Sequence, residues 1–355
     1  MPPNYQPLHK ISMIKPRKLN SGDKIATVSL SWGGPSIFPH RYQVGVQQLE
    51  KEFGLEVVEM PNTLRDANWL AQNPKARADD LMQAFADPSI KGIFATIGGD
   101  DSIRLLPYLD LNVIRDNPKI FMGYSDTTIS HLVCHKAGLV SFYGPSILAE
   151  FAENGGIFPY ITQSLRQTIF SSEAIGEVKQ NTEGWTVERL DWGNPENQNI
   201  KRKLNPSTGW KFLQGKGIHR GHLIGGCLEV FDWTRGIELF PKEWKDAILF
   251  LETSEDAPPP EFVKFTLRVY AAMGILSQLS GILFGRPYDN ESKFVEYDQA
   301  ILQIVRDEEG LTELPIITHM DFGHTSPMFV IPYGLHAEID CDNQRFSIVE
   351  NAVLD

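Results

Sequence analysis

The sequence contains 355 residues, of which 42% are hydrophobic and 22% are charged, and its formal net charge at pH 7 is −12. This length exceeds that of one typical compact domain, and the composition is that of a globular protein with a large core. The acidic balance argues against a nucleic-acid duplex as the main partner, because binding to phosphates requires a basic surface.

The cysteine content and the distribution of apolar residues indicate the cellular setting. Three cysteines, Cys134, Cys227 and Cys341, are too few and too widely spaced for a disulfide framework. The first twenty residues lack the apolar run of a signal peptide, and no stretch approaches the length of a membrane span. We therefore expect a soluble, cytoplasmic protein with no membrane partner.

The first half of the chain alternates between apolar runs typical of strands and amphipathic stretches typical of helices. Strands are expected within residues 23–31, 55–60, 90–99, 119–123 and 139–145, and helices within 41–54, 75–88, 103–110 and 125–138. Continuous apolar strands between helices predict a mostly parallel, doubly wound sheet covered on both faces. We assign residues 1–175 to this N-terminal α/β domain. Functional sites in such sheets lie at the carboxyl ends of strands, where Gly99 and Ser125 fall.

The second half begins with a polar connection and continues with further strands and helices. Residues 176–217 are expected to form a linker and a tryptophan-bearing loop, and loops of this length are usually functional or disordered. Residues 218–355 are expected to form a second α/β or β-rich domain. Its strands lie within 247–256, 281–288 and 314–324, its helices within 258–274 and 295–310, and its terminal hairpin within 337–350.

The segment GYSDTT, residues 123–128, places Ser125 on a corner between a strand and a helix. Such a corner projects the hydroxyl and directs helix N–H groups to the place where an oxyanion forms. The segment has the first half of the G-x-S-x-G pattern, but Thr127 replaces the trailing glycine. A helix N-cap is the alternative interpretation, and the motif by itself favours it.

A nucleophilic serine requires a histidine and an acid that orients it. His324 follows an apolar strand on a glycine-containing loop, at another carboxyl edge. Glu252 ends a strand of five apolar residues, and an acid at that position is costly unless it is paired. The alternative is a strand-end residue that reaches water, an interpretation that suits Glu255 or Asp256 better.

Other histidines and glycines offer weaker signals. His131 and His135 lie one helical turn apart, but without an intervening glutamate they are expected to be surface or core residues rather than metal ligands. No metal site or organic cofactor is predicted. The glycines of TIGGDDS precede two aspartates, which would repel phosphate. The backbone amides of Gly99 and Asp126 offer an oxyanion hole instead, and an ordinary tight turn is the alternative.

Three segments, GYSDTT, LFLETSED and FGHTSP, occur in this order, together with TIGGDDSIRLLPYLD, YGPSI and GHLIGGCLEVF. In combination they resemble the LD-carboxypeptidase family of serine peptidases, from about residue 18 to the C-terminus. The resemblance implies a triad of Ser125, Glu252 and His324, with oxyanion donors in the backbone of Gly99 and Asp126. It also implies an N-terminal domain that carries the serine, a C-terminal domain that carries the other two residues, and a homodimer.

The sequence is similar to the microcin C self-immunity branch of this family in two places, the segment ETSED and the long tryptophan-bearing loop. Trp185 and Trp192 are the first candidates for stacking on a purine, and Arg104 for meeting a carboxylate or phosphate. Alternatively, the tryptophans pack the loop onto its own domain or a partner subunit, and Arg104 is a solvated helix residue.

The expected activity is hydrolysis, by a serine nucleophile, of an amide bond near the C-terminus of a peptide or of a peptidyl or aminoacyl nucleotide. Its partner is then a small peptide or peptidyl-nucleotide substrate. One alternative is an LD-carboxypeptidase that releases the terminal D-Ala from murein tetrapeptide. The other is a non-catalytic protein that binds peptides or nucleotides.

Overall fold

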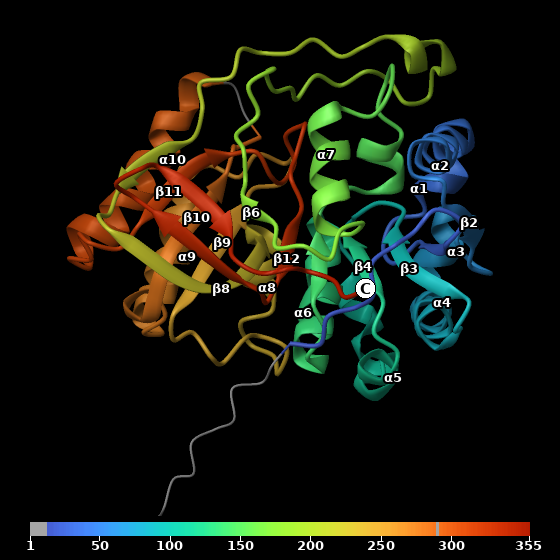
Figure 1. Ribbon diagram of the computed structural model, residues 1–355, viewed down its shortest axis with the longest axis horizontal. Coiled ribbons are helices and arrows are strands. Elements are labelled where there is room, and N and C mark those ends of the chain that lie inside the picture. The colour runs from blue at the N-terminus through green and yellow to red at the C-terminus, as the bar shows by residue number, and fades with distance from the viewer. Residues whose placement is uncertain (1–12, 289–290) are drawn as a thin grey trace, which may run out of the picture.

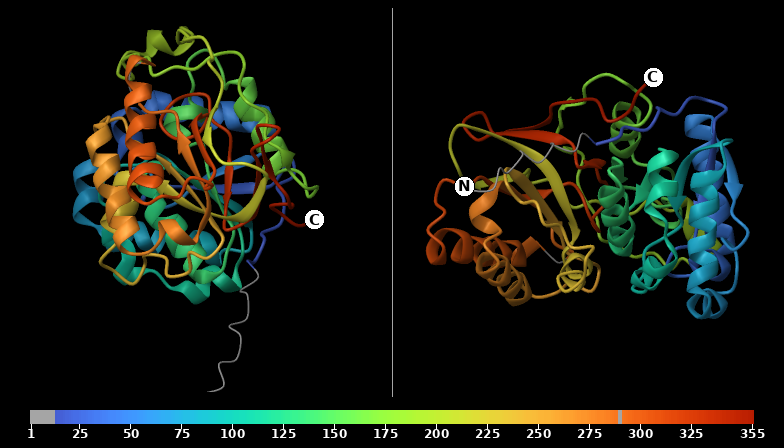
Figure 2. Two further views of the ribbon diagram at one scale, coloured as in Figure 1. Left: turned by 90° about the vertical axis from the view of Figure 1, so that its left-hand side faces the viewer. Right: turned by 90° about the horizontal axis from the view of Figure 1, so that it is seen from below.

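The computed structural model describes residues 13–288 and 291–355. Two β-sheets lie side by side, each with its own helices, so that the molecule has two lobes (Figure 2). The blue and green N-terminal half forms most of one lobe, and the yellow to red C-terminal half forms most of the other (Figure 1). The fold class expected from the sequence is confirmed.

The first sheet has six strands in the order β12-β5-β4-β3-β1-β2. The five strands from the N-terminal half are parallel to one another, whereas β12 pairs with β5 in the antiparallel direction. The strands are β1 (Lys24–Val28), β2 (Glu56–Glu59), β3 (Ile90–Ala95), β4 (Ile120–Gly123), β5 (Ser141–Tyr143) and β12 (Ile331–Tyr333).

Helices cover both faces of this sheet, as a doubly wound fold requires. Buried residues of α4, α5 and α6 form one cluster with the strands, and those of α2 and α7 form another on the opposite face. The helices are α1 (Gly34–Ile37), α2 (Pro39–Phe53), α3 (Ala67–Gln72), α4 (Pro74–Ala86), α5 (Leu111–Asp116), α6 (Thr128–Ala137) and α7 (Pro159–Thr168).

The second sheet is mixed, with eight strands in the order β6-β14-β13-β8-β9-β10-β11-β7. Its four central strands β8, β9, β10 and β11 are parallel, and β13 with β14 forms the predicted terminal hairpin. The strands are β6 (Gly176–Glu177), β7 (Lys211–Gln214), β8 (Ile218–Cys227), β9 (Ala247–Glu252), β10 (Leu279–Gly285), β11 (Ile316–Met320), β13 (His336–Asp340) and β14 (Arg345–Ile348). The helices are α8 (Leu228–Trp233), α9 (Pro260–Ala272) and α10 (Phe294–Leu302).

The connection between β6 and β7 and the strand β12 are among the segments that join the lobes. The connection between β6 and β7 passes across the top of both lobes in Figure 1 and contains the short 3₁₀ helix η4 (Pro195–Asn199). Strand β12 belongs to the C-terminal half of the chain but completes the edge of the first sheet, where Ile331 pairs with Tyr143. Each half of the chain therefore contributes residues that pack against the other half.

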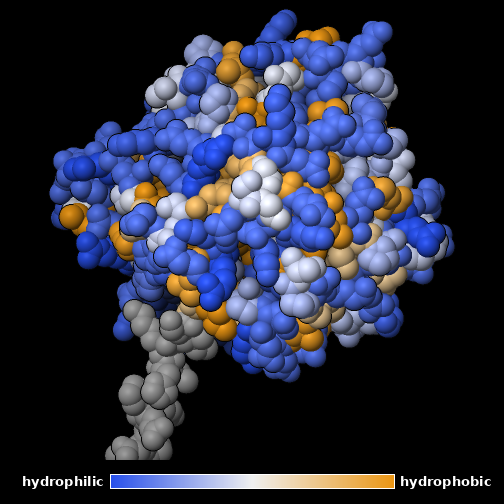
Figure 3. Space-filling model, turned by 45° about the vertical axis from the view of Figure 1, so that its right-hand side comes forward, coloured by the Kyte–Doolittle hydropathy of each residue, from blue (hydrophilic) through white to orange (hydrophobic). Residues whose placement is uncertain are grey.

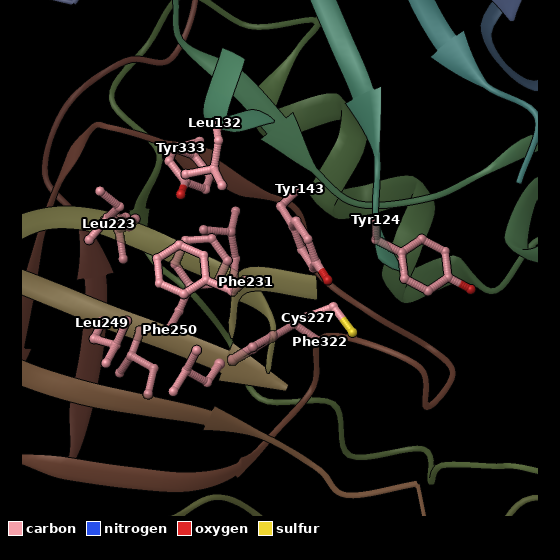
Figure 4. Packing of buried hydrophobic residues seen from close by; sticks show 14 of the residues in the cluster. Tyr124, Leu132, Tyr143, Leu223, Cys227, Phe231, Leu249, Phe250, Phe322 and Tyr333 are labelled. Atoms are coloured by element: carbon pink, nitrogen blue, oxygen red, sulfur yellow. The ribbon is translucent and has the colours of Figure 1, made fainter. Parts of the chain in front are cut away.

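The buried core is continuous between the lobes. One cluster includes Phe121 of the first sheet, Phe250 of the second and Tyr333 of β12. Figure 4 shows Tyr143 between the strands of the first sheet and the buried residues of the second half. Because the lobes pack together here, the carboxyl ends of β4, β9 and β11 lie close together at the boundary between the lobes.

The face drawn in Figure 3 carries apolar side chains in scattered patches among hydrophilic ones. Over the described ranges, every helix is too short or too polar to cross a bilayer.

Candidate active site

Ser125 occupies a strained corner between β4 and α6. Its φ angle is +62°, in the left-handed region that costs a non-glycine residue about 1–2 kcal/mol. A Cβ on Gly123 would lie 2.8 Å from Cγ2 of Thr127 and 2.9 Å from Cβ of Ala95. Gly123, two residues before Ser125, is thus required by close packing, while the position two residues after the serine accepts a threonine.

Gly98 makes room for the Ser125 side chain. A Cβ built on Gly98 would lie 2.8 Å from Cβ of Ser125, 2.9 Å from its Oγ and 3.4 Å from the backbone nitrogen of Asp126. The neighbouring Gly99 has a φ of +143°, and a Cβ there would lie 2.3 Å from Oγ of Ser31. The predicted glycine turn after β3 therefore lies directly against the serine.

The structure brings together the three side chains predicted for the triad. Nε2 of His324 lies 3.0 Å from Oγ of Ser125, and Nδ1 of His324 lies 2.7 Å from Oε2 of Glu252. Glu252 ends the fully buried strand β9 and is itself 0% exposed. In the neutral imidazole, with Nδ1–H donated to the carboxylate, the Nε2 lone pair faces the serine hydroxyl, as removal of the serine proton requires.

The loop that carries His324 is fixed by a buried acid, Asp321. Its Oδ1 accepts a hydrogen bond from Arg286 at 2.7 Å, and its Oδ2 accepts one from Nε1 of Trp210 at 2.7 Å. Gly323, with a φ of +92°, allows Glu252 to approach, because a Cβ there would lie 2.6 Å from Oε2 of Glu252. These contacts hold the imidazole at the nucleophile.

A second carboxylate also reaches the histidine. Oε2 of Glu255 lies 3.1 Å from Nε2 of His324, although the Glu255 side chain is 51% exposed. Burial alone would lower the pKa of His324, but the charges of Glu252 and Glu255 outweigh it and raise this pKa well above the usual range. The hydrogen bond to His324 in turn lowers the pKa of Glu255 to about 2. Glu255 does not simply reach water, as its position in the sequence had suggested.

Tyr143 contacts both ends of the triad, and sequence reasoning missed it. Its hydroxyl accepts a hydrogen bond from the backbone N–H of Ser125 at 3.2 Å and donates one to Oε1 of Glu252 at 2.5 Å. Burial and the nearby Glu252 raise the pKa of Tyr143 well above its ordinary value, so the hydroxyl keeps its proton.

His131 belongs to the core, and His135, one helical turn further along α6, is half-buried. His131 is 0% exposed, and its ring nitrogens lie 2.8 Å from Oγ of Ser141 and 2.8 Å from the carbonyl oxygen of Gly123. Burial lowers the pKa of His131 to about 4 and that of His135 to about 4. His131 thus ties α6 to the end of β4, which supports the corner that carries Ser125.

A cavity of about 840 Å³ opens beside the triad, a volume in the range of small-molecule sites. Its wall includes Ser125, His324, Gly99 and, from the long connection, Trp192. The guanidinium carbon of Arg41 lies 4.3 Å from the centre of the Trp192 ring, a cation–π contact. Phe38 packs edge-on against the same indole at 5.7 Å.

Arg41 is a buried cation in the wall of this cavity. Its Nε donates to the carbonyl oxygen of Leu148 at 2.6 Å and its Nη1 to Oδ1 of Asn154 at 2.9 Å. Burial lowers its pKa to about 10, so it remains charged at neutral pH. Among the described residues, no carboxylate forms an ion pair with it. Nothing in the sequence around Arg41, near the start of a predicted helix, signals this placement.

Two predicted substrate contacts do not line the cavity. Trp185 is 2% exposed and packs against Phe294, with Arg286 over its ring at 5.3 Å. Arg104 donates to the carbonyl oxygen of Ala71 at 2.6 Å and pairs with Asp101 at 2.9 Å on the surface. Trp185 packs its loop, which is the alternative that the sequence left open, and Trp192 is the tryptophan of the loop that faces the site.

One group among the described residues has the donor set for a metal ion. A ligand atom from each of Cys227, Glu252 and His324 lies within 4.8 Å of the other two. The Glu252 and His324 atoms already share a hydrogen bond, so an ion there would replace the proton between them.

Comparison with known proteins shows the family of this chain. Models of the LD-carboxypeptidase N-terminal and C-terminal domains match residues 25–144 and 220–339. The chain is 31% identical to the putative carboxypeptidase VC_A0337 of Vibrio cholerae over 346 residues, which cover 96% of this chain and 99% of that protein. The chain belongs to the LD-carboxypeptidase family.

Members of the LD-carboxypeptidase family with other names are also similar. The microcin C7 self-immunity protein MccF of Escherichia coli is 30% identical over 93% of this chain and 94% of its own length. An MccF-like protein from Streptococcus pneumoniae, solved in complex with AMP, superposes with a TM-score of 0.84 at 33% identity, covering 93% of this chain and 99% of its own. MccF in complex with aspartyl sulfamoyl adenosine superposes with a TM-score of 0.82 at 27% identity, covering 96% and 100%.

Proposed function

We propose that this protein is a serine peptidase that hydrolyses the amide bond between an amino acid or short peptide and a nucleotide. The observation that carries the proposal is the continuous hydrogen-bonded line from Ser125 through His324 to Glu252, with distances of 3.0 and 2.7 Å. Membership of a peptidase family supports amide hydrolysis as the reaction of these three residues, and the large cavity beside them has room for a substrate.

In the proposed reaction, His324 takes the proton of Ser125 as the hydroxyl attacks the amide carbonyl. Glu252 holds the imidazole in the required tautomer and stabilises the imidazolium that forms. His324 then gives the proton to the leaving nitrogen, and the acyl group remains as an ester on Ser125. Water, activated by the same imidazole, releases the acid and restores the serine.

The backbone amides of Gly99 and Asp126 are the proposed oxyanion donors. The position of a Cβ on Gly98 lies 2.9 Å from Oγ of Ser125 and 3.4 Å from the nitrogen of Asp126, so this turn faces the point of attack. The Asp126 carboxylate is engaged elsewhere, since its Oδ2 accepts the backbone N–H of Ser102 at 2.9 Å. One such donor contributes about 3–4 kcal/mol to transition-state stabilisation in other hydrolases.

The wall around Trp192 is the proposed nucleotide end of the cavity. An indole supported by the Arg41 guanidinium offers a flat surface for a purine, and the cation favours a nearby phosphate or sulfamate. The complexes of the similar proteins with AMP and with aspartyl sulfamoyl adenosine support this assignment.

The test compares two substrates and two variants. We expect the wild-type protein to consume an aminoacyl sulfamoyl adenosine, with the free amino acid measured by mass spectrometry, and Ser125→Ala to leave it intact. Ser277→Ala, which removes an exposed hydroxyl that donates to the Gly274 carbonyl oxygen at 3.3 Å, is the control. Loss of D-Ala from murein tetrapeptide, without turnover of the nucleotide, would support the LD-carboxypeptidase alternative instead. Binding of the nucleotide with no turnover, and no labelling of Ser125 by a fluorophosphonate, would support a non-catalytic protein.

A further inference from the structure

We infer that Tyr143 is a positioning residue that joins the backbone of the nucleophile to the acid of the triad, an inference that rests on the proposed function. Tyr143 ends β5, the strand next to β4, and is 1% exposed. Its hydroxyl is the one side-chain group within the described residues that bonds both the Ser125 backbone and the Glu252 carboxylate.

The direction of each hydrogen bond follows from the chemistry of the groups. The Ser125 N–H can only donate, so the Tyr143 oxygen accepts it at 3.2 Å. The ionised Glu252 carboxylate can only accept, so the Tyr143 O–H donates to its Oε1 at 2.5 Å. The raised pKa of Tyr143 keeps the proton available for this bond.

These two bonds close a ring. It runs from the Ser125 N–H to Tyr143, to Oε1 and then Oε2 of Glu252, through the imidazole of His324, and back to Oγ of the same serine. The ring fixes a residue whose φ of +62° is strained, and it leaves Oε2 of Glu252 to His324. Because the carboxylate and the phenol are both buried, no water replaces a missing member at low cost.

Replacement of Tyr143 by Phe removes both hydrogen bonds and keeps the packing of the aromatic side chain. Among the described residues, the freed Oε1 of Glu252 then loses its one hydrogen-bond donor, so the carboxylate attracts the imidazolium of His324 more strongly and raises its pKa. We expect kcat to fall about 10- to 100-fold with little change in KM. The acid limb of the pH profile should move to higher pH.

The matched control is Tyr333→Phe. Tyr333 is equally buried, and its hydroxyl also accepts one backbone N–H and donates to one oxygen, both of Gly225 and both at 3.1 Å. Among the described residues its hydroxyl contacts no member of the triad. We expect Tyr333→Phe to lower the melting temperature to a similar extent and to leave the acid limb where it is in the wild type.

The readout is the rate at which a fluorophosphonate labels Ser125 between pH 5 and 9, which requires no knowledge of the substrate. A slower reaction and an acid limb moved upward in Tyr143→Phe, but not in Tyr333→Phe, support the inference. Equal rates and equal pH profiles for wild type and Tyr143→Phe overturn it, as does the same loss in both variants without a shift. A wild-type protein that the reagent does not label overturns the proposed function instead.

Discussion

The Nε2 atom of His324 lies 3.1 Å from a carboxylate oxygen of Glu255, almost as close as the 3.0 Å that separates it from the Ser125 hydroxyl. A carboxylate at this distance favours a proton on Nε2. A protonated Nε2 cannot accept the serine proton, so Glu255 stabilises the inactive charge state of the histidine. A substrate whose leaving nitrogen approaches Nε2 has to displace Glu255 from that position.

Glu255→Gln should make the enzyme more active at low pH. Activity requires neutral imidazole and falls as the pH drops through the pKa of His324, which Glu252 and Glu255 together raise. Removal of one charge lowers this pKa, so the acid limb of kcat/KM should move to lower pH. The control is Asp256→Asn, which neutralises the neighbouring exposed acid on the same loop. An acid limb that stays in place, or that moves upward, would show that Glu255 does not act on His324.

Glu252→Gln should nearly abolish turnover without unfolding the protein. The amide keeps the shape of the side chain but no longer stabilises the imidazolium, and the equivalent loss in other triads costs on the order of 10⁴-fold in kcat. Glu229→Gln is the comparison, because this half-buried acid bonds Ser254 at 2.5 Å rather than the histidine. Steady-state kinetics with circular dichroism separates lost chemistry from lost structure. Comparable activity in the two variants would remove Glu252 from the triad.

Gly98→Ala should displace the nucleophile. The added methyl would lie 2.8 Å from Cβ and 2.9 Å from Oγ of Ser125, which is closer than real carbon contacts allow. A misplacement of about 1 Å at a reacting atom can lower the rate about 100-fold. Gly236→Ala, where a Cβ meets nothing within 4 Å, is the control and should retain full activity. Labelling of Ser125 in Gly98→Ala at the wild-type rate would contradict this account of the glycine.

Trp192→Ala should weaken nucleotide binding while leaving the chemical step intact. Stacking of a base on an aromatic side chain contributes about 1–3 kcal/mol, which corresponds to an increase in KM of roughly 5- to 150-fold. The variant Trp233→Ala removes an indole that is 47% exposed on α8, outside the cavity, and should bind normally. Isothermal titration with AMP measures the difference directly. Unchanged affinity in Trp192→Ala would exclude this wall as the base site.

The fold class could be predicted from the sequence, and the same patterns placed the three residues proposed for the triad near the ends of strands. Apolar strands between helices predicted the first sheet. Glu252 ends strand β9 at its carboxyl end, and Ser125 and His324 follow β4 and β11. The serine motif by itself favoured a helix cap. The combination of segments that resembles one family made the interpretation of the glycines and the triad specific.

The other residues of the site could not be predicted, because their roles depend on how elements distant in the sequence pack together. Trp185 and Trp192 are separated by only six intervening residues in one polar loop, yet one is buried against Phe294 and the other lines the cavity. Arg41 and Tyr143 lie within a predicted helix and a predicted strand, where nothing in the local pattern distinguishes them from structural residues. Their roles arise only when distant elements pack together.

The placement of β12 bears on how the two halves of the chain depend on each other. His324 and Ile331 are close in sequence, so a strand anchored in the first sheet tethers the proposed general base to the lobe that holds the proposed nucleophile, Ser125. A single proteolytic cut in the polar connection around Gly193 would therefore leave two fragments that still share a sheet. Such a nicked protein should migrate as one species in native gel filtration, whereas either fragment expressed without the other would lack half of the reactive centre.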